Sequence, residues 1–512
     1  MKKLFLLLLC FFGHAFADGL PDLGDSSQTV LSPAEERQIG RQSMLQIRAR
    51  KQYLNDAEIN DYLGQLGAGL VEHSSESGQD FEFFAVDDYS INAFAMPGGL
   101  VGVNAGLLLT AQSESELASV LSHEISHITQ HHIARMLAGQ QNDTLTSMAA
   151  IAIAILAART NPQAAEAAIV SVQAGAIQKQ LNYTRSFEQE ADRIGLQLLQ
   201  KSGYNARSMP EFLLRLQKAT RLQDSNAPSY ARTHPITSER IAEIENRVQT
   251  QPYRLIPDSL NFQLVRAKLI AAQKTAPDAI AYFDAALGEK NFGNPIAQRY
   301  GLVAALLRDN QIERAAQELA TLRNQLQESQ ASNNKVSGKP GLAKKTLNTL
   351  NTQNALNIQN APKGQTPGFN PMIATLTGQV MRAEKNDAAT LAFYAAASKT
   401  FPQHRALIYD YVELLLQDQQ AETAVKLLTE QLVRHPSDAT LYDLQARAYA
   451  AQGKVLEQYQ ARAYSYAWQG NLYAALEQLE LAKRAGGSFY QLSTIESDLR
   501  ELRELLDDHK KK

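Results

Sequence analysis

Two histidines four residues apart, His123 and His127, enclose the sequence Glu124-Ile-Ser. Residues spaced by four lie on one face of a helix, so both imidazoles can bind the same zinc ion. Glu124 lies in the neighbouring sector, near the metal but rotated away from direct ligation. There it can take a proton from a water molecule that zinc activates and pass it to a leaving amine. The spacing therefore predicts a hydrolytic zinc site.

A catalytic zinc site needs a third protein ligand and an open position. Glu188 and Asp192 are four residues apart in a predicted helix and share one face. A carboxylate from this second helix can complete the zinc shell, and the expected arrangement has Glu188 as ligand and Asp192 holding a ligand histidine through its second nitrogen. Glu190 is the alternative ligand. Because it lies about 200° around the helix from Glu188, we expect it to face solvent.

Two further histidines, His131 and His132, continue along the helix that carries the predicted zinc ligands. His131 is one turn beyond His127, where it could not easily reach the same metal. We interpret both as part of a polar helix face.

The elements that must position these residues are a short sheet and a capped helix. Strand-like segments cover 81–86, 91–96 and 100–103, and Pro97-Gly98-Gly99 forms a bend between the last two. Proline in such a run favours an edge strand. A capping box at Ser113–Glu116 then starts the metal helix, whose apolar residues recur at helical spacing.

The N-terminal residues have the pattern of a secretory signal peptide. Two lysines precede the apolar run 4–12, and Ala15-Phe16-Ala17 matches a cleavage site. We therefore expect residues 1–17 to be removed, together with Cys10, the only cysteine. Residues 145–158 are apolar but shorter than the roughly 20 residues that span a bilayer. They predict a buried helix or a peripheral membrane contact.

The C-terminal half is predicted to be helical and repetitive. Identical spacings of 34 residues separate Pro402 from Pro436, Ile408 from Tyr442 and Leu415 from Tyr449. This period of paired helices resembles tetratricopeptide repeats. A polar stretch at about 328–370 predicts a flexible insertion. The formal net charge of −3 gives no indication of a nucleic-acid partner.

The motifs together resemble the M48 family of zinc metallopeptidases, of the gluzincin type. The resemblance rests on the following segments: His123–His127, Glu188–Asp192, Asn92–Gly99, Val103–Leu108, Thr233–Pro235, and Arg240 with Ile241. It covers about residues 30–250. The implied fold is α+β and mostly α, with a metallopeptidase domain at 18–255 that contains a small β-sheet. An all-α tetratricopeptide-like repeat domain follows at 256–512.

The resemblance also implies roles for individual residues. One zinc ion per chain would be bound by His123, His127 and Glu188, with Glu124 as the general base and Asp192 supporting a ligand. His234 would lie near the metal, either occupying the open position in a latent enzyme or stabilising the transition state as a catalytic residue. The strand Ala93-Phe94-Ala95-Met96 would bind substrate as an added strand.

The resemblance, together with the signal peptide and the repeats, implies a periplasmic zinc endopeptidase with chaperone-like activity. Its expected substrates are misfolded or assembling outer-membrane β-barrel proteins, and its repeat domain would contact the β-barrel assembly machinery. An alternative hypothesis is a chaperone or scaffold of that machinery whose metal site is mainly latent. The two differ in whether Glu124 is needed for the cellular role.

Overall fold

A computed structural model provides the architecture of the chain. It describes residues 30–76, 78–138, 185–222, 228–250, 255–289, 293–336, 370–385 and 387–510. The predicted signal peptide, the apolar segment 145–158 and residues 337–369 of the predicted insertion lie outside these ranges. Among the described residues, no helix combines the length and apolar character needed to cross a bilayer.

Two capped helices begin the described chain. Helix α1, Pro33–Ala49, starts at Ser32 with a reciprocal capping box to Glu35. Helix α2, Ala57–Val71, is capped by the side chain of Asp56.

A three-stranded sheet follows, in the order β1-β3-β2. β1 (Glu82–Val86) pairs parallel with β3 (Leu100–Asn104), and β2 (Ala93–Met96) pairs antiparallel with β3. Pro97, Gly98 and Gly99 join β2 to β3, and both glycines have φ of +80°, which favours glycine over any other residue. The predicted bend and the predicted edge position of β2 are therefore confirmed.

The single helix predicted to carry the zinc motif, His131 and His132 is instead two helices. After α3 (Ala105–Thr110), helix α4 spans Glu114–Thr129 and α5 spans His132–Ala138. Between α4 and α5, His131 has a φ of +49°, a left-handed conformation that ends a right-handed helix. The prediction that His131 and His132 continue along the metal helix was wrong, because α4 ends at Thr129 and His132 begins a separate helix, α5.

Four helices complete the part of the chain around α4. They are α9 (Arg185–Lys201), α10 (Ser208–Leu222), α11 (Ser229–Thr233) and α12 (Ser238–Gln249). Helix α9 packs closely along α4 at Gly195, where a Cβ atom would lie 3.0 Å from the Ser122 carbonyl oxygen and 3.1 Å from His123 N. The missing side chain lets the two helices approach each other.

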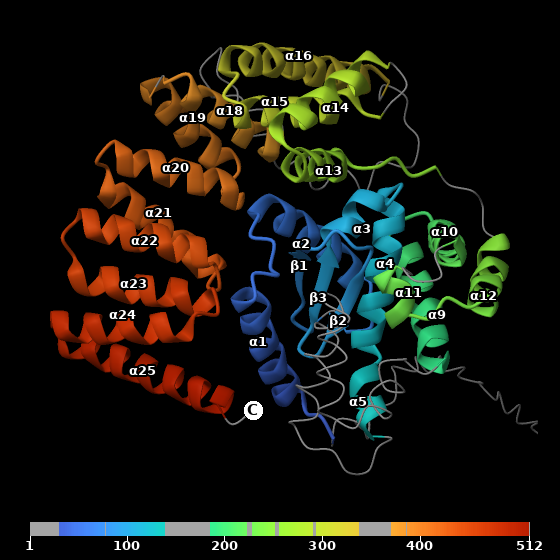
Figure 1. Cartoon of the computed structure of the whole chain (residues 1–512), viewed down its shortest axis with the longest axis horizontal. Helices are drawn as coiled ribbons and strands as arrows, with labels where there is room; N and C mark the ends of the chain where they lie inside the picture. The colour runs from blue at the N-terminus through green and yellow to red at the C-terminus, as the bar shows by residue number, and fades with distance from the viewer. Residues whose placement is uncertain are drawn as a thin grey trace, which may run out of the picture.

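The remaining helices form antiparallel pairs that wrap around the sheet and its helices (Figure 1). They are α13 (Leu260–Gln273), α14 (Ala276–Gly288), α15 (Pro295–Arg308), α16 (Ile312–Val336), α18 (Pro371–Ala383), α19 (Asp387–Thr400), α20 (Arg405–Gln417), α21 (Ala421–Arg434), α22 (Ala439–Ala451), α23 (Val455–Trp468), α24 (Leu472–Ala485) and α25 (Phe489–Lys510). Helices α18, α20 and α22 begin at residues 371, 405 and 439, which reproduces the 34-residue period found in the sequence.

The start of the predicted insertion is corrected by α16, which continues to Val336. Residues 328–336 are therefore helical. Buried Leu322 and Leu326 anchor the helix just before them, and a helix that is already formed extends readily through polar residues.

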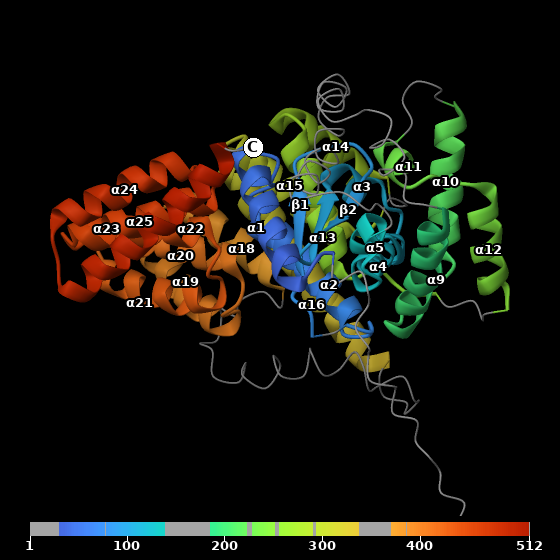
Figure 2. The same ribbon diagram turned by 90° about the horizontal axis from the view of Figure 1, so that it is seen from below.

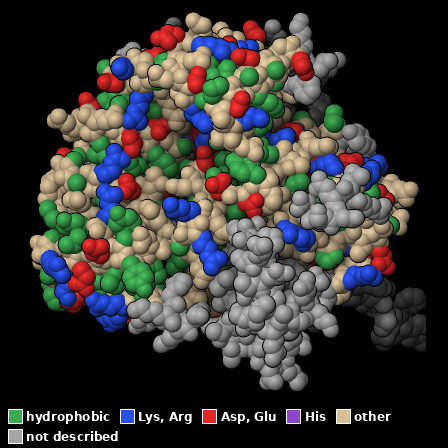
Figure 3. Space-filling model, viewed as in Figure 1, with side chains coloured by type: hydrophobic (Ala, Val, Ile, Leu, Met, Phe, Trp, Pro, Cys, Tyr) green, Lys and Arg blue, Asp and Glu red, His purple; other side chains and the backbone are tan. Residues whose placement is uncertain are grey.

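The sheet and α4 lie between two helical groups (Figure 2). Repeat helices α22–α25 lie on one side and α9–α12 on the other. One hydrophobic cluster includes residues of α2, the sheet, α4, α9, α10 and the first repeat helices α13–α18. On the face shown in Figure 3, cationic and anionic side chains are interspersed, so that face presents no extended field of one sign.

Candidate functional site

Helix α4 directs His123 and His127 into the protein interior, where each is 2% exposed. Their Nε2 atoms lie 3.0 Å apart. The four-residue spacing brings the two rings to the same point, as the sequence predicted.

Glu188 approaches the two imidazoles from α9. One carboxylate oxygen, Oε2, lies 3.5 Å from His123 Nε2, and the other, Oε1, lies 3.6 Å from His127 Nε2. Ligands around a tetrahedral zinc ion at about 2.0–2.1 Å are separated from one another by about 3.3 Å. The separations of the three side chains therefore fit one zinc ion.

His234 completes the cluster from the turn that follows α11. Its Nδ1 atom lies 3.4 Å from His123 Nε2 and 3.0 Å from Glu188 Oε1. Each of four side chains offers one possible ligand atom, and these atoms all lie within 4.8 Å of one another; the four are His123, His127, Glu188 and His234. His234 thus belongs to the same group of possible metal ligands, and the Tyr230 ring stacks on it with centroids 4.7 Å apart.

Glu124 faces the same centre but does not touch it. The residue is fully buried, its Oε1 lies 3.5 Å from His234 Nε2, and neither carboxylate oxygen has a hydrogen-bond partner among the described residues. Leaving a buried carboxylate without hydrogen bonds is costly. Such a group is typical of a functional site that binds a further polar molecule.

The charges of the cluster also fit a divalent cation. Glu124, Glu188 and Asp192 are at most 4% exposed, and Arg240, which is 1% exposed, supplies the one guanidinium that the described residues place among them. With neutral imidazoles, three carboxylates and one guanidinium leave two net negative charges, which a Zn²⁺ ion would balance.

The two ligand-type histidines have opposite pKa shifts. Burial lowers the pKa of His127 well below its usual value, so this imidazole is neutral and offers a lone pair. Burial also acts to lower the pKa of His123, but the Asp192 and Glu188 carboxylates outweigh it and raise this pKa to about 10. The cluster thus favours a positive charge at its centre, which a metal ion could supply in place of the proton.

Asp192 and Arg240 hold the outer side of the cluster. Asp192 Oδ1 lies 3.0 Å from His123 Nδ1, and Arg240 donates to both Asp192 oxygens at 2.7 and 2.8 Å. The same guanidinium donates to the Pro235 carbonyl at 2.7 Å and lies 2.7 Å from Glu188 Oε2. Arg240 therefore links the α9 carboxylates to the turn that follows α11.

Sequence reasoning missed a second outer contact. Because the chain turns at His131, His132 comes back to His127, and their Nδ1 atoms lie 2.8 Å apart. Glu190 was expected to face solvent, yet its Oε2 lies 3.3 Å from His132 Nε2 and accepts from Arg135 at 2.9 Å. No periodicity in the sequence could signal this, since it depends on one left-handed residue.

The predicted substrate strand β2 lies beside α4 and is closed to solvent. Its residues Ala93, Phe94, Ala95 and Met96 are between 0% and 3% exposed. Met96 and Pro97 share a small hollow with His127, so β2 ends next to the cluster. An added strand would require this edge to open.

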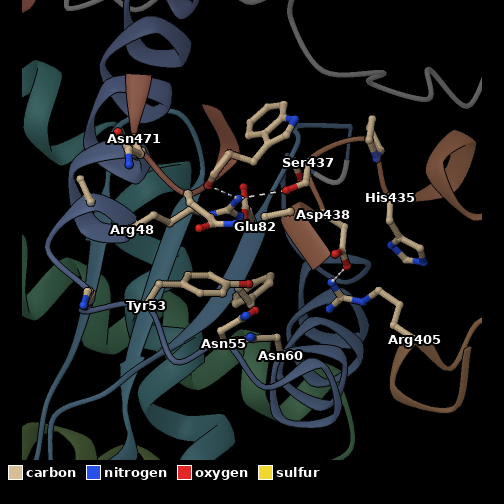
Figure 4. Close-up of a pocket in the computed structure, with 18 of the residues that line it drawn as sticks. Arg48, Tyr53, Asn55, Asn60, Glu82, Arg405, His435, Ser437, Asp438 and Asn471 are labelled. Atoms are coloured by element: carbon tan, nitrogen blue, oxygen red, sulfur yellow. Dashed lines mark hydrogen bonds and ion pairs between the residues drawn. The ribbon is translucent and has the colours of Figure 1, made fainter. Parts of the chain in front are cut away.

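A separate cavity of about 900 Å³ lies between the sheet and the repeat helices. Figure 4 shows Arg48, Tyr53 and Glu82 on one wall facing Ser437 and Asp438 on the other. Arg48 donates to the Ser437 carbonyl at 3.0 Å, so its side chain bridges the two parts of the chain.

Comparisons with known proteins agree with the geometry of the cluster. Residues 58–248 match the model of peptidase family M48. The β-barrel assembly-enhancing protease of Escherichia coli O157:H7 is 31% identical over 470 residues, which cover 91% of this chain and 87% of the relative. A relative from Vibrio cholerae is 41% identical over 252 residues, 49% of this chain and about half (52%) of its own length. The mitochondrial metalloendopeptidase OMA1 of Schizosaccharomyces pombe is 29% identical over 184 residues, 36% of this chain and 51% of the relative.

Proposed function

Because this chain belongs to the M48 family of metallopeptidases, we propose that it is a zinc-dependent endopeptidase with His123, His127 and Glu188 as its zinc ligands. The observation that carries the proposal is the convergence of these ligand atoms at tetrahedral separations. The two net negative charges of the surrounding buried groups support a divalent ion at that point.

A zinc ion at this position would polarise the scissile carbonyl and make a water molecule acidic. Glu124 then acts as general base, because its buried carboxylate has room for a new hydrogen bond and lies beside the ligand cluster. It accepts the proton of the attacking water and delivers it to the leaving amine. Asp192 keeps the Nδ1 hydrogen of His123 in place, which leaves Nε2 for the metal.

His234 is proposed to hold the resting enzyme latent. Its Nδ1 atom lies where a fourth ligand would bind, 3.0 Å from Glu188 Oε1, and catalysis needs this position open. Stacking on Tyr230 and burial to 2% exposure support a held conformation. Displacement of His234 would then admit the substrate. The alternative is that His234 donates a hydrogen bond to the oxyanion of the transition state.

Casein cleavage by three zinc-loaded proteins tests these roles. The unchanged protein is expected to cleave slowly, and Glu124→Gln is expected to lose at least about 100-fold in rate, because general base catalysis contributes 10²–10⁴-fold. A His234→Ala protein that cleaves faster than the parent supports latency. A slower one supports the transition-state role, and an active Glu124→Gln protein refutes the proposed base.

The proposed substrates are outer-membrane β-barrel proteins that are misfolded or still assembling, as the name of the E. coli relative suggests. An extended segment of such a substrate would add to β2, the edge strand that ends beside the cluster. We place the metallopeptidase domain at 18–255 and tetratricopeptide-like repeats at 256–512, which would contact the assembly machinery. The signal-like residues 1–17 support a periplasmic location.

The second candidate function is a chaperone or scaffold that works mainly with the metal site closed. Two observations favour this function: the edge of β2 is buried, and a separate cavity opens between the sheet and the repeats. Barrel assembly in cells that produce only Glu124→Gln protein distinguishes the two. Full assembly with that variant would make the peptidase the lesser role, whereas accumulation of uncleaved barrel precursors would support the peptidase.

A further inference from the structure

We propose that His132 is a positioning residue that fixes the proton and the orientation of His127. The role rests on the zinc site proposed above and adds to it a residue outside the His-Glu-x-x-His motif. The contact that carries it joins the Nδ1 atoms of the two imidazoles over 2.8 Å. His132 is fully buried, so both of its ring nitrogens need partners within the protein.

The hydrogen in this contact must belong to His127. The Nε2 atom of His127 faces His123 and Glu188, so its lone pair is the one available to a metal. A neutral imidazole then carries its single hydrogen on Nδ1. His127 therefore donates through Nδ1, and His132 accepts through its own Nδ1.

The remaining hydrogen of His132 is then placed on Nε2, which lies 3.3 Å from Glu190 Oε2. A His132 that carried its hydrogen on Nδ1 would face a second N–H, unless His127 moved its own hydrogen to Nε2. That hydrogen would occupy the lone pair needed for zinc. Only one placement of the two hydrogens satisfies both contacts and keeps the Nε2 lone pair of His127 available to zinc.

Residues of α9 and α5 hold the His132 ring in place. Phe187 stacks on it with centroids 4.7 Å apart and an interplanar angle of 23°. Arg135 lies over the Phe187 ring at 4.9 Å and also donates to Glu190 at 2.9 Å. Because Phe187 and Glu190 flank Glu188 on α9, the helix that supplies the carboxylate ligand also fixes the partner of the histidine ligand.

The two histidine ligands thus have parallel supports. His123 donates to Asp192, which Arg240 holds, and His127 donates to His132, which is held by a carboxylate that in turn binds an arginine. Groups that orient a metal ligand through its second nitrogen contribute about 10–100-fold to metal affinity or activity. We expect this factor for His132.

Zinc dissociation constants from chelator competition, and Co²⁺ absorption spectra, test the role in the full chain. His132→Phe preserves a ring against Phe187 but removes the acceptor, and is expected to weaken zinc binding about 10–100-fold and to shift the Co²⁺ bands. His132→Gln offers a carbonyl acceptor and should recover part of the affinity. His131→Asn is the matched control, since asparagine tolerates the positive φ of this residue, and should bind zinc as the parent does.

A His132→Phe protein with parental zinc affinity and an unchanged Co²⁺ spectrum would overturn the role of His132. If this variant does not fold, as judged by circular dichroism, Glu190→Ala carries the test, because Glu190 is partly exposed and its loss should be tolerated. Zinc binding several-fold weaker than in the parent supports the role, and parental affinity overturns it. A parent that binds no zinc would instead overturn the zinc site itself.

Discussion

Arg240 is buried to 1% exposure, and replacing it with methionine should strongly destabilise the fold. The guanidinium makes two hydrogen bonds to Asp192 and lies 2.7 Å from Glu188 Oε2. Arg240→Met keeps much of the aliphatic volume but leaves two buried carboxylates without their cation. Breaking a buried ion pair by removing one partner costs about 3–5 kcal/mol, a large part of the total stability of about 5–15 kcal/mol typical of folded proteins.

Urea unfolding followed by circular dichroism measures this loss, with EDTA present so that metal binding does not contribute. With an m-value of about 2.5–3 kcal/mol/M, the midpoint should fall by about 1–2 M. The matched control is Arg247→Met on the same helix, where an arginine that is 42% exposed pairs with Glu243 four residues away. Such an exposed ion pair stabilises a helix by about 0.2–0.5 kcal/mol. If Arg240→Met shifts the urea midpoint no more than Arg247→Met does, the Arg240 guanidinium does not stabilise the Asp192 and Glu188 carboxylates.

Three further predictions concern packing and buried charge. Gly195→Val should lower the free energy of unfolding by about 1–3 kcal/mol and weaken zinc binding, because a side chain at this position would push α9 and its Glu188 away from α4. A parental free energy of unfolding together with parental zinc affinity would refute the close packing. Burial acts to raise the pKa of Glu58, but Lys268 and His404 outweigh it and lower this pKa to about 2. The ionised Glu58 therefore contributes fully to stability above the unfolded-state pKa, and this contribution is lost as the pH falls from about 4.5 to about 2. In urea titrations, the stability gap between parent and Glu58→Gln should close over that range, and a constant gap would contradict the pairing. Burial raises the pKa of Asp410 to about 6, so Asp410→Asn should stabilise the protein by up to about 3 kcal/mol at pH 7 and by far less at pH 4. A loss of stability at pH 7 would contradict that burial effect.

Local sequence patterns predicted the parts of the site that depend on one element. The spacing of His123 and His127 placed both rings at one point, because α4 is regular over this stretch. The pair Glu188 and Asp192 likewise shares a face of α9, and both are buried. The Pro-Gly-Gly bend was predicted for the same reason: a few adjacent residues determine it.

Contacts between elements could not be predicted from those patterns. A left-handed φ at His131 ends the metal helix, and no periodicity marks it, since a non-glycine residue usually avoids this conformation. Glu190 was expected to face solvent because the geometry of α9 alone points it away from Glu188. A neighbouring helix, α5, supplies its partners His132 and Arg135. The burial of β2 similarly depends on what packs against its edge.

Zinc content tests the central claim most directly. We predict that the purified full chain, analysed by inductively coupled plasma mass spectrometry, contains one zinc ion per chain. The variant that carries both His123→Ala and His127→Ala should contain none while keeping its helical circular dichroism spectrum. A parent without zinc, or a double variant that retains one equivalent, would contradict a zinc site built on α4.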